Sequence, residues 1–140
     1  MQYKNIQGLE VPEIGLGTYK LHDRICSRIV RTALDIGYRH IDTAQMYKNE
    51  REIGEALSVS NVPREDIFLS TKIWHTNLEA DDVLQSTEES LRQMDTPYVD
   101  LLMIHWPNDQ YDLRSTIESM LVLRDQGKAM NIGVSNFPLH

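Results

Sequence analysis

The chain has 140 residues, a formal net charge of −7 and a single cysteine, Cys26. This length is sufficient for one domain with a buried core. The negative charge argues against a nucleic-acid-binding surface, although it leaves room for a local basic pocket. No apolar run approaches the length of a membrane-spanning helix, and one cysteine cannot form an internal disulfide. We therefore expect a cytoplasmic protein that contacts neither nucleic acid nor membrane.

The pattern of elements predicts a parallel sheet. At the start, residues 3–6 and 9–11 flank Gln7-Gly8, a two-residue turn that predicts an antiparallel hairpin. Apolar runs then predict strands at residues 14–18, 40–42, 67–71, 99–104 and 130–135. Between them, apolar residues at three- and four-residue spacing predict helices at about residues 23–36, 49–61, 79–94 and 112–127. Apolar strands that alternate with helices are typical of a parallel sheet that helices cover.

Helix faces and ends can also be predicted. The first helix is expected to bury the stripe Ile25, Ile29, Thr32, Ala33 and Ile36. Asn49, with Glu52 three residues later, predicts a variant of the capping box at the start of the second helix. Asp112 or Ser115 is expected to cap the fourth helix.

Polar residues fall at the end of each of the later predicted strands. These residues are Asp42, Lys72, His105 and the pair Ser135-Asn136. Taken singly, a strand-end aspartate can be a cap, a lysine a solvated side chain and the histidine a structural residue. Because the carboxyl ends of parallel strands share one edge of the sheet, we expect all of them to meet there, at the edge where α/β barrels carry out chemistry.

The combination predicts general acid catalysis. Tyr47 could give a proton to a substrate oxygen, but free tyrosine, with a reference pKa of about 10, is a poor acid. An ammonium beside the phenol stabilises the phenolate. Lys72 is the candidate cation, Asp42 would hold it in place, and His105 could orient the substrate oxygen. One histidine and one carboxylate do not make a metal ligand set, so no metal is expected.

Four segments of the chain resemble the aldo-keto reductase family. They are GYRHIDTAQMYKNE at residues 37–50, KIW at 72–74, VDLLMIHWP at 99–107 and IGVSNF at 132–137. They occur in the order found in that family, and the resemblance covers essentially the whole chain. It implies an α/β fold, the parallel (β/α)8 TIM barrel, with about the first five strands present and the amino-terminal hairpin closing its base. It also implies NADPH-dependent reduction of aldehydes and ketones.

The resemblance assigns roles to particular positions. It makes Asp42, Tyr47, Lys72 and His105 a catalytic tetrad with Tyr47 as the proton donor. The positions that it places at the cofactor are Thr18, Tyr19, Asp42, Ser135 and Asn136. Those that it places at the carbonyl substrate are Tyr19, Trp74, His105 and Trp106.

The chain is about half as long as eight strand–helix units require. Residues 1–140 are therefore expected to be the amino-terminal portion of a single barrel domain, with two unpaired sheet edges and an apolar concave face. We expect that the full-length form is a monomer and that this portion needs another copy or the missing half. Two alternatives to an active reductase remain: a nicotinamide-binding sensor without turnover, and an inactive half-barrel. The sequence leaves open the substrate and the choice between NADPH and NADH.

Overall fold

The computed structural model describes residues 1–139 and confirms the predicted alternation of elements. The strands are β1 (Tyr3–Ile6), β2 (Leu9–Pro12), β3 (Leu16–Gly17), β4 (His40–Asp42), β5 (Phe68–Ile73), β6 (Val99–Ile104) and β7 (Ala129–Val134). The α-helices are α1 (Asp23–Asp35), α2 (Glu50–Ser58), α3 (Ala80–Met94) and α4 (Leu113–Asp125). Two short 3₁₀ helices are η1 (Gln45–Tyr47) and η2 (Arg64–Asp66).

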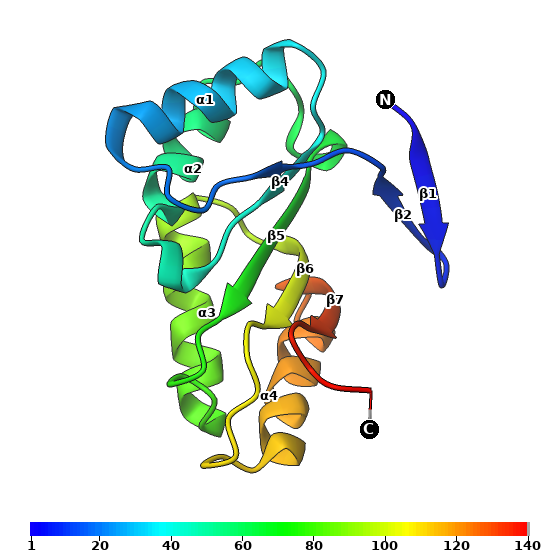
Figure 1. Cartoon of the computed structure of the whole chain (residues 1–140), viewed down its shortest axis with the longest axis vertical. Helices are drawn as coiled ribbons and strands as arrows, with labels where there is room; N and C mark the ends of the chain where they lie inside the picture. Colours follow the sequence, from blue (N-terminus) through cyan, green and yellow to red (C-terminus); the bar gives the residue numbers. More distant parts are fainter. Residues whose placement is uncertain (140) are drawn as a thin grey trace.

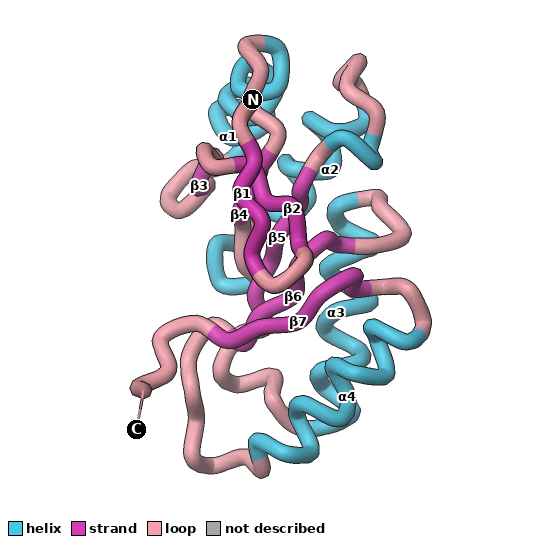
Figure 2. Tube along the Cα trace, turned by 90° about the vertical axis from the view of Figure 1, so that its right-hand side faces the viewer, coloured by secondary structure: helices cyan, strands magenta, loops and turns pink. Residues whose placement is uncertain are grey.

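The main sheet is parallel and runs in chain order. Its order is β3-β4-β5-β6-β7, while β1 and β2 form a separate antiparallel hairpin. The helices line one side of this sheet, and the hairpin lies on the other side (Figures 1 and 2). Parallel neighbours joined by helical crossovers are the repeating unit of a TIM barrel, so the structure is a partial barrel of five strands. Within the described residues, β3 and β7 each have one neighbour and form the two sheet edges.

The first strand of this sheet is shorter than predicted. β3 spans two residues, Leu16 and Gly17, instead of residues 14–18. Among the described residues its partner is β4, with Leu16 opposite Ile41 and Gly17 opposite Asp42, and β4 begins at His40, so no residue of β4 lies opposite Ile14. Ile14 is accordingly exposed.

The predicted inward face of α1 is mostly wrong, since only Ala33 is buried and Ile29 half-buried. The residues that α1 buries are Cys26, Val30, Ala33 and Leu34. By contrast, Ile25 and Ile36 are 56% and 71% exposed. The helix carries two neighbouring apolar stripes, and the spacing within each fits a helical period equally well. Only the position of the sheet decides which stripe is buried.

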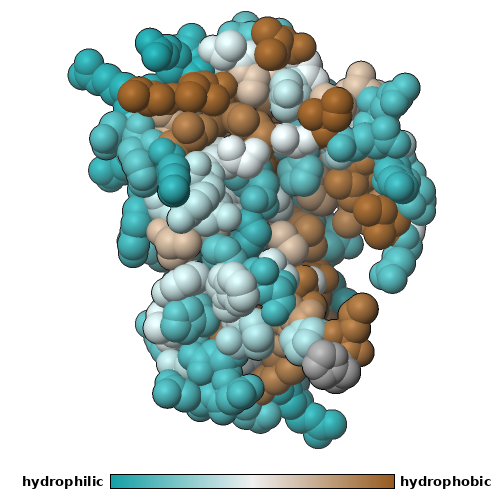
Figure 3. Space-filling model, in the orientation of Figure 1, coloured by the Kyte–Doolittle hydropathy of each residue, from teal (hydrophilic) through white to brown (hydrophobic). Residues whose placement is uncertain are grey.

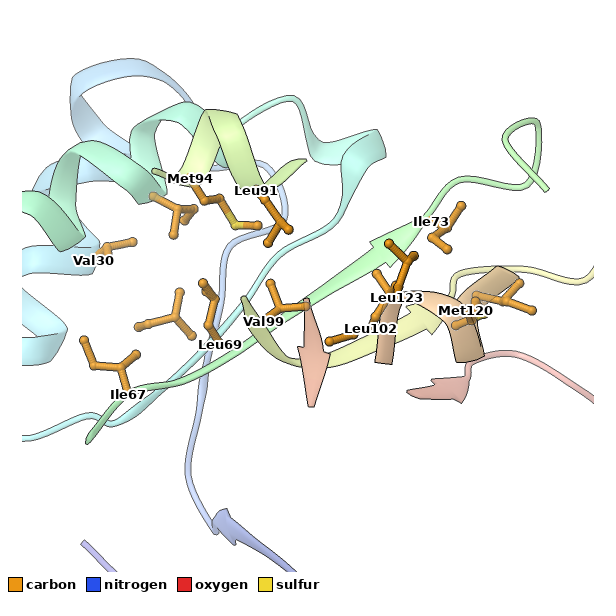
Figure 4. Packing of buried hydrophobic residues seen from close by; sticks show 14 of the residues in the cluster. Val30, Ile67, Leu69, Ile73, Leu91, Met94, Val99, Leu102, Met120 and Leu123 are labelled. Atoms are coloured by element: carbon orange, nitrogen blue, oxygen red, sulfur yellow. The ribbon is translucent and has the colours of Figure 1, made fainter. Parts of the chain in front are cut away.

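The core lies between the sheet and the helices (Figure 4). Leu69 and Leu102 from the strands pack with Met94 and Leu123 from the helices, all essentially inaccessible to water. Helices α2 and α3 approach each other at Gly54, where an added Cβ would lie 2.6 Å from the carbonyl oxygen of Gln93. A glycine is therefore required for this close helix contact.

Polar and apolar side chains are mixed on the face shown in Figure 3. None of the described helices is both long enough and apolar enough to cross a membrane.

At the start of α4, Asp112 Oδ1 accepts a hydrogen bond from the backbone N–H of Arg114 at 3.2 Å, which confirms Asp112 as the cap.

Candidate active site

The strand-end residues lie together at the carboxyl edge of the sheet. Asp42 is the last residue of β4, and Lys72 is the last residue but one of β5. His105 and Ser135 directly follow β6 and β7. The backbone ladder continues past the strand ends, because the N–H of His105 donates to Ile73 O at 3.0 Å and that of Ser135 to Ile104 O at 2.9 Å. These bonds fix where the side chains begin.

An ion pair joins Lys72 and Asp42. Lys72 Nζ lies 2.6 Å from Asp42 Oδ2 and also donates to Thr43 O at 2.9 Å. The lysine side chain is only 9% exposed and that of the aspartate 27%. An ammonium this far from water requires an anionic partner, so Asp42 is needed to keep Lys72 charged in place.

Tyr47 lies against the Lys72 ammonium. The phenol comes from η1, in the loop that follows β4, and Lys72 Nζ lies 5.2 Å from the ring centroid. This distance is within the range of cation–π attraction. The ring also packs against Tyr19, with centroids 5.2 Å apart, and against His105, with centroids 5.7 Å apart. The structure therefore brings the predicted acid, cation and histidine into one cluster.

His105 is buried and packs edge-to-face against Trp74, with ring centroids 5.4 Å apart. Burial lowers the pKa of His105 below its ordinary value of 6.5, and Lys72 lowers it further. The imidazole is therefore neutral at neutral pH and can donate or accept a hydrogen bond. Its Nδ1 is buried and has no hydrogen-bond partner among the described residues, which leaves Nε2 to meet a ligand.

The predicted cofactor positions are arranged around the same edge. Asn136 Nδ2 donates to His105 O at 2.8 Å and to Ser135 Oγ at 3.1 Å, and its φ of 61° lies in the left-handed region. Thr18 is buried, and its hydroxyl donates to Asp42 O at 2.9 Å. This hydroxyl therefore orients the end of β4. Tyr19 is exposed, and its ring packs against that of Tyr47.

The aromatic residues predicted for the substrate differ in their setting. Trp74 is half-buried and contacts the rings of both His75 and His105. Trp106 is exposed, next to His105 in the chain. Both follow strand ends, as expected for residues that line a pocket at this edge.

Asn49 does not act as the predicted helix cap. It precedes α2, but its side chain makes no capping hydrogen bond, so the predicted capping box is wrong. Instead, Nδ2 donates to Thr18 O at 2.9 Å and Leu21 O at 3.0 Å, while Oδ1 accepts from the Thr43 hydroxyl. These carbonyls belong to the loop after β3, so the buried amide ties that loop to the loop after β4.

Gln45 has a comparable role that the sequence did not reveal. Its Oε1 accepts hydrogen bonds from the backbone N–H of Trp74 at 2.9 Å and from Asn77 Nδ2 at 3.0 Å. Gln45 therefore fixes the loop after β5 against η1, next to Tyr47. A polar residue in a loop follows no periodic pattern, so no signal in the sequence marked this contact.

With this geometry in place, the chain can be compared with known proteins. Residues 13–140 match the Aldo/keto reductase family. The chain belongs to that family. The relatives of the chain include oxidoreductases.

Among the curated relatives, the chain is 43% identical over 133 residues to methylglyoxal reductase DkgB of Escherichia coli O157:H7, which covers 94% of this chain and 50% of that protein. It is 40% identical over 133 residues to glycerol 2-dehydrogenase (NADP(+)) of Saccharomyces cerevisiae, covering 93% of this chain and 42% of that protein. The chain thus spans about half the length of the curated relatives it matches.

Solved structures agree with the fold. The thermostable aldo-keto reductase Tm1743 superimposes with a TM-score of 0.91 at 40% identity, covering 99% of this chain and 55% of that chain. A putative 2,5-diketo-D-gluconic acid reductase B gives a TM-score of 0.90 at 43% identity, covering 93% and 46%. The resemblance to the aldo-keto reductase family that the motifs indicated is confirmed.

Proposed function

We propose that residues 1–140 are the amino-terminal portion of a barrel domain that reduces aldehydes and ketones to alcohols with NADPH, and that Tyr47 is the proton donor. The observation that carries this proposal is the placement of Lys72, which pairs with Asp42 at 2.6 Å and lies 5.2 Å from the centre of the Tyr47 ring. An ammonium in this position stabilises the phenolate that remains after the proton has left.

Each member of the tetrad then has a distinct task. The neutral His105 donates a hydrogen bond to the carbonyl oxygen and orients it. Tyr47 transfers its proton to that oxygen as the carbonyl carbon is reduced. Lys72 stabilises the resulting phenolate, and Asp42 holds Lys72 in position. Because the fold already holds these groups at one edge of the sheet, little entropy is lost in bringing them together during the reaction.

The residues after β7 fit the nicotinamide end of the cofactor. A carboxamide needs both a donor and an acceptor, and Ser135 and Asn136 present a hydroxyl and an amide oxygen next to His105. Thr18 and Tyr19 would lie along the same ring, and Asp42 would lie close to it. Bound NADPH supplies the hydride. A relative named glycerol 2-dehydrogenase (NADP(+)) supports this choice of cofactor over NADH.

A small carbonyl compound is the substrate class that the site supports. Tyr19, Trp74, His105 and Trp106 provide an aromatic surface beside the tetrad, and apolar walls with few polar groups are typical of small-molecule sites. Relatives named methylglyoxal reductase make methylglyoxal the first compound to test. We also propose that the protein works in the cytoplasm as a monomer once the barrel is complete.

The test is NADPH consumption with methylglyoxal and a panel of small aldehydes, for the wild type and Tyr47→Phe. We expect Tyr47→Phe to lower kcat by at least about 100-fold, as for loss of a general acid, with NADPH binding unchanged. Tyr98→Phe is the matched control, because the Tyr98 ring lies over Arg64, among residues outside the cluster. Equal rates for the wild type and Tyr47→Phe would reject Tyr47 as the acid.

The same experiment separates the alternatives. A sensor barrel would bind NADPH tightly and consume none with any carbonyl compound. If the 140-residue chain alone neither binds nor consumes NADPH, it is an inactive half-barrel that needs the remaining strands or another copy of the chain. The complete tetrad favours the reductase over the sensor, because a sensor has no use for a proton donor.

A further inference from the structure

A network of hydrogen bonds also extends from Oδ1 of Asp42, the carboxylate oxygen that does not contact Lys72. Ser70 Oγ lies 2.6 Å from Asp42 Oδ1 and donates to it, because an ionised carboxylate can only accept. His40 Nε2 lies 3.2 Å from Ser70 Oγ. The one hydroxyl hydrogen of Ser70 is used on Asp42, so His40 must donate to Ser70. The proton of a neutral His40 is therefore on Nε2.

The sheet register explains why these side chains meet. Across β4 and β5, His40 pairs with Phe68 and Asp42 pairs with Ser70. Alternate residues of a strand point to the same face, so Ser70 and Lys72 share the face of β5 that meets His40 and Asp42. The Asp42 carboxylate accordingly has the Ser70 hydroxyl on one oxygen and the Lys72 ammonium on the other.

The His40 ring is held on two sides. A Cβ at Gly15 would lie 2.8 Å from His40 Nδ1 and 2.9 Å from its Cγ, so only glycine leaves room for the ring in this position. On another side, the ring packs edge-on against Phe68, with centroids 4.8 Å apart. A ring enclosed in this way keeps its Nε2 directed at Ser70.

The charge state of His40 suits a donor role. Burial lowers the pKa of His40, although Asp42 and, more weakly, Asp100 raise it, and Lys72 lowers it. The imidazole is therefore neutral at neutral pH and carries one N–H, which fits the single acceptor that it meets.

We propose that Ser70 and His40 are positioning residues for the reduction described above. Together they hold Asp42 Oδ1, so that Oδ2 stays on Lys72 and Lys72 stays beside Tyr47. Without the Ser70 hydroxyl the carboxylate can turn about its terminal bond, and the ammonium is no longer fixed relative to the phenol. This inference rests on the proposed function for its kinetic part, but the hydrogen-bond chain itself can be tested without turnover.

The first experiment determines the tautomer of His40 by nitrogen NMR of the 140-residue chain labelled with ¹⁵N-histidine. The His40 signals are assigned by their loss in His40→Phe. We expect the Nε2–H tautomer in the wild type and in Ser70→Thr, and a mixture of tautomers in Ser70→Ala. A wild-type His40 in the Nδ1–H form would overturn the proposal.

The second experiment compares kinetics in the protein with reductase activity. Ser70→Ala is expected to lower kcat about tenfold, which is typical of losing a hydrogen bond to a charged group. This effect is smaller than the one expected for Tyr47→Phe. The KM for the carbonyl compound should stay within about twofold, because Ser70 does not touch the substrate. Ser70→Thr restores the hydroxyl and should restore kcat.

Two further variants make the kinetic result specific. Gly15→Ala displaces the His40 ring without removing a polar group, and it should lower kcat in the same way as Ser70→Ala. Thr71→Val is the control, because the Thr71 hydroxyl faces the other side of β5 and donates to Glu50. An unchanged kcat in Ser70→Ala, or a failure of Ser70→Thr to restore it, would overturn the positioning role. A wild type without turnover contradicts the proposed function, while the tautomer of His40 still decides the hydrogen-bond chain.

Discussion

Lys72 Nζ lies 2.6 Å from Asp42 Oδ2, although the two residues are 30 positions apart in the chain. They are neighbours because β4 and β5 are adjacent and parallel, and because both side chains lie near the ends of their strands. The side chain of Lys72 is 9% exposed, so water can do little to stabilise its charge. The pair therefore places a fixed positive charge beside Tyr47.

Removing that charge should impair catalysis. In Lys72→Met we expect kcat for the reduction to fall by about 100-fold or more, because the phenolate left after proton transfer loses its electrostatic partner. The measurement is steady-state NADPH consumption, with NADPH binding followed separately. Lys128→Met is the control, because Lys128 pairs with Glu88 in a more exposed ion pair far along the chain. A kcat in Lys72→Met within twofold of the wild type would contradict the role of Lys72.

The stability of the chain should fall as the pH is lowered from neutral because of His105. Burial, and then Lys72, lowers the folded-state pKa of His105 below 6.5. In the unfolded chain His105 takes up its proton at about pH 6.5, which the folded chain does not yet do. The free energy of unfolding therefore decreases as the pH falls from about 6.5 to the lowered pKa, and the full contribution of His105 is present only above about pH 6.5. Urea unfolding between pH 8 and about pH 5 measures this slope.

Substituting His105 tests how much of the pH dependence of the free energy of unfolding comes from this residue. His105→Gln should give a shallower decrease over the same pH range, while His40, whose pKa burial also lowers, retains its own contribution with the same sign. An identical slope in the wild type and His105→Gln would show that His105 is not the group responsible.

Glu50 should act in the opposite direction. This carboxyl is 3% exposed, and burial raises its pKa above 4.5. The folded chain therefore holds the proton at a pH at which the unfolded chain has released it, so stability falls as the pH rises through the raised pKa. Glu50→Gln keeps an acceptor for the Thr71 hydroxyl and removes the charge. We expect this variant to be more stable than the wild type at pH 7.

The pH dependence distinguishes this explanation from better packing. The gain in Glu50→Gln should disappear below about pH 4.5, where the carboxyl is protonated in both the folded and unfolded states. Glu55→Gln, on the exposed side of the same helix, should change little. Chemical denaturation at pH 7 and pH 4 provides the comparison, and a gain that is independent of pH would argue against the buried charge.

Gly54 should not tolerate a side chain. In Gly54→Ala the new Cβ would lie 2.6 Å from Gln93 O and 2.7 Å from the carbonyl carbon of Met94, both backbone atoms that cannot move aside freely. We expect destabilisation of about 2 kcal/mol, within the range for overpacking a core. Gly17→Ala is the control, because a Cβ there meets nothing within 4 Å. Thermal unfolding that is equal in the two variants would contradict the close contact of α2 and α3.

Much of this arrangement could be predicted from the sequence because it depends on local patterns and on simple topology. The apolar runs predicted β5, β6 and β7 to within two residues at each end. The alternation of strands and helices then required Asp42, Lys72 and His105 to share one edge, which the structure confirms. The spacing of Ser70 and Lys72 also placed both on one face of a strand, a signal that could have indicated the contact between Ser70 and Asp42.

The parts that could not be predicted depend on long-range packing. Cys26 and Ile25 are adjacent and both apolar, and only contact with the rest of the fold makes one buried and the other exposed. Asn49 has the residue type and position of a helix cap, but its partners are carbonyl oxygens 28 and 31 positions away. No local pattern encodes such a distant partner.

The Asn49 carboxamide has a consequence for motion at the site. Its Nδ2 donates to Thr18 O and Leu21 O in the loop after β3, and its Oδ1 accepts a hydrogen bond from the Thr43 hydroxyl in the loop after β4. Displacing either loop would leave a fully enclosed amide without partners, which is costly. The two loops therefore open as a single cooperative unit, and their backbone amides should exchange with deuterium at a common rate.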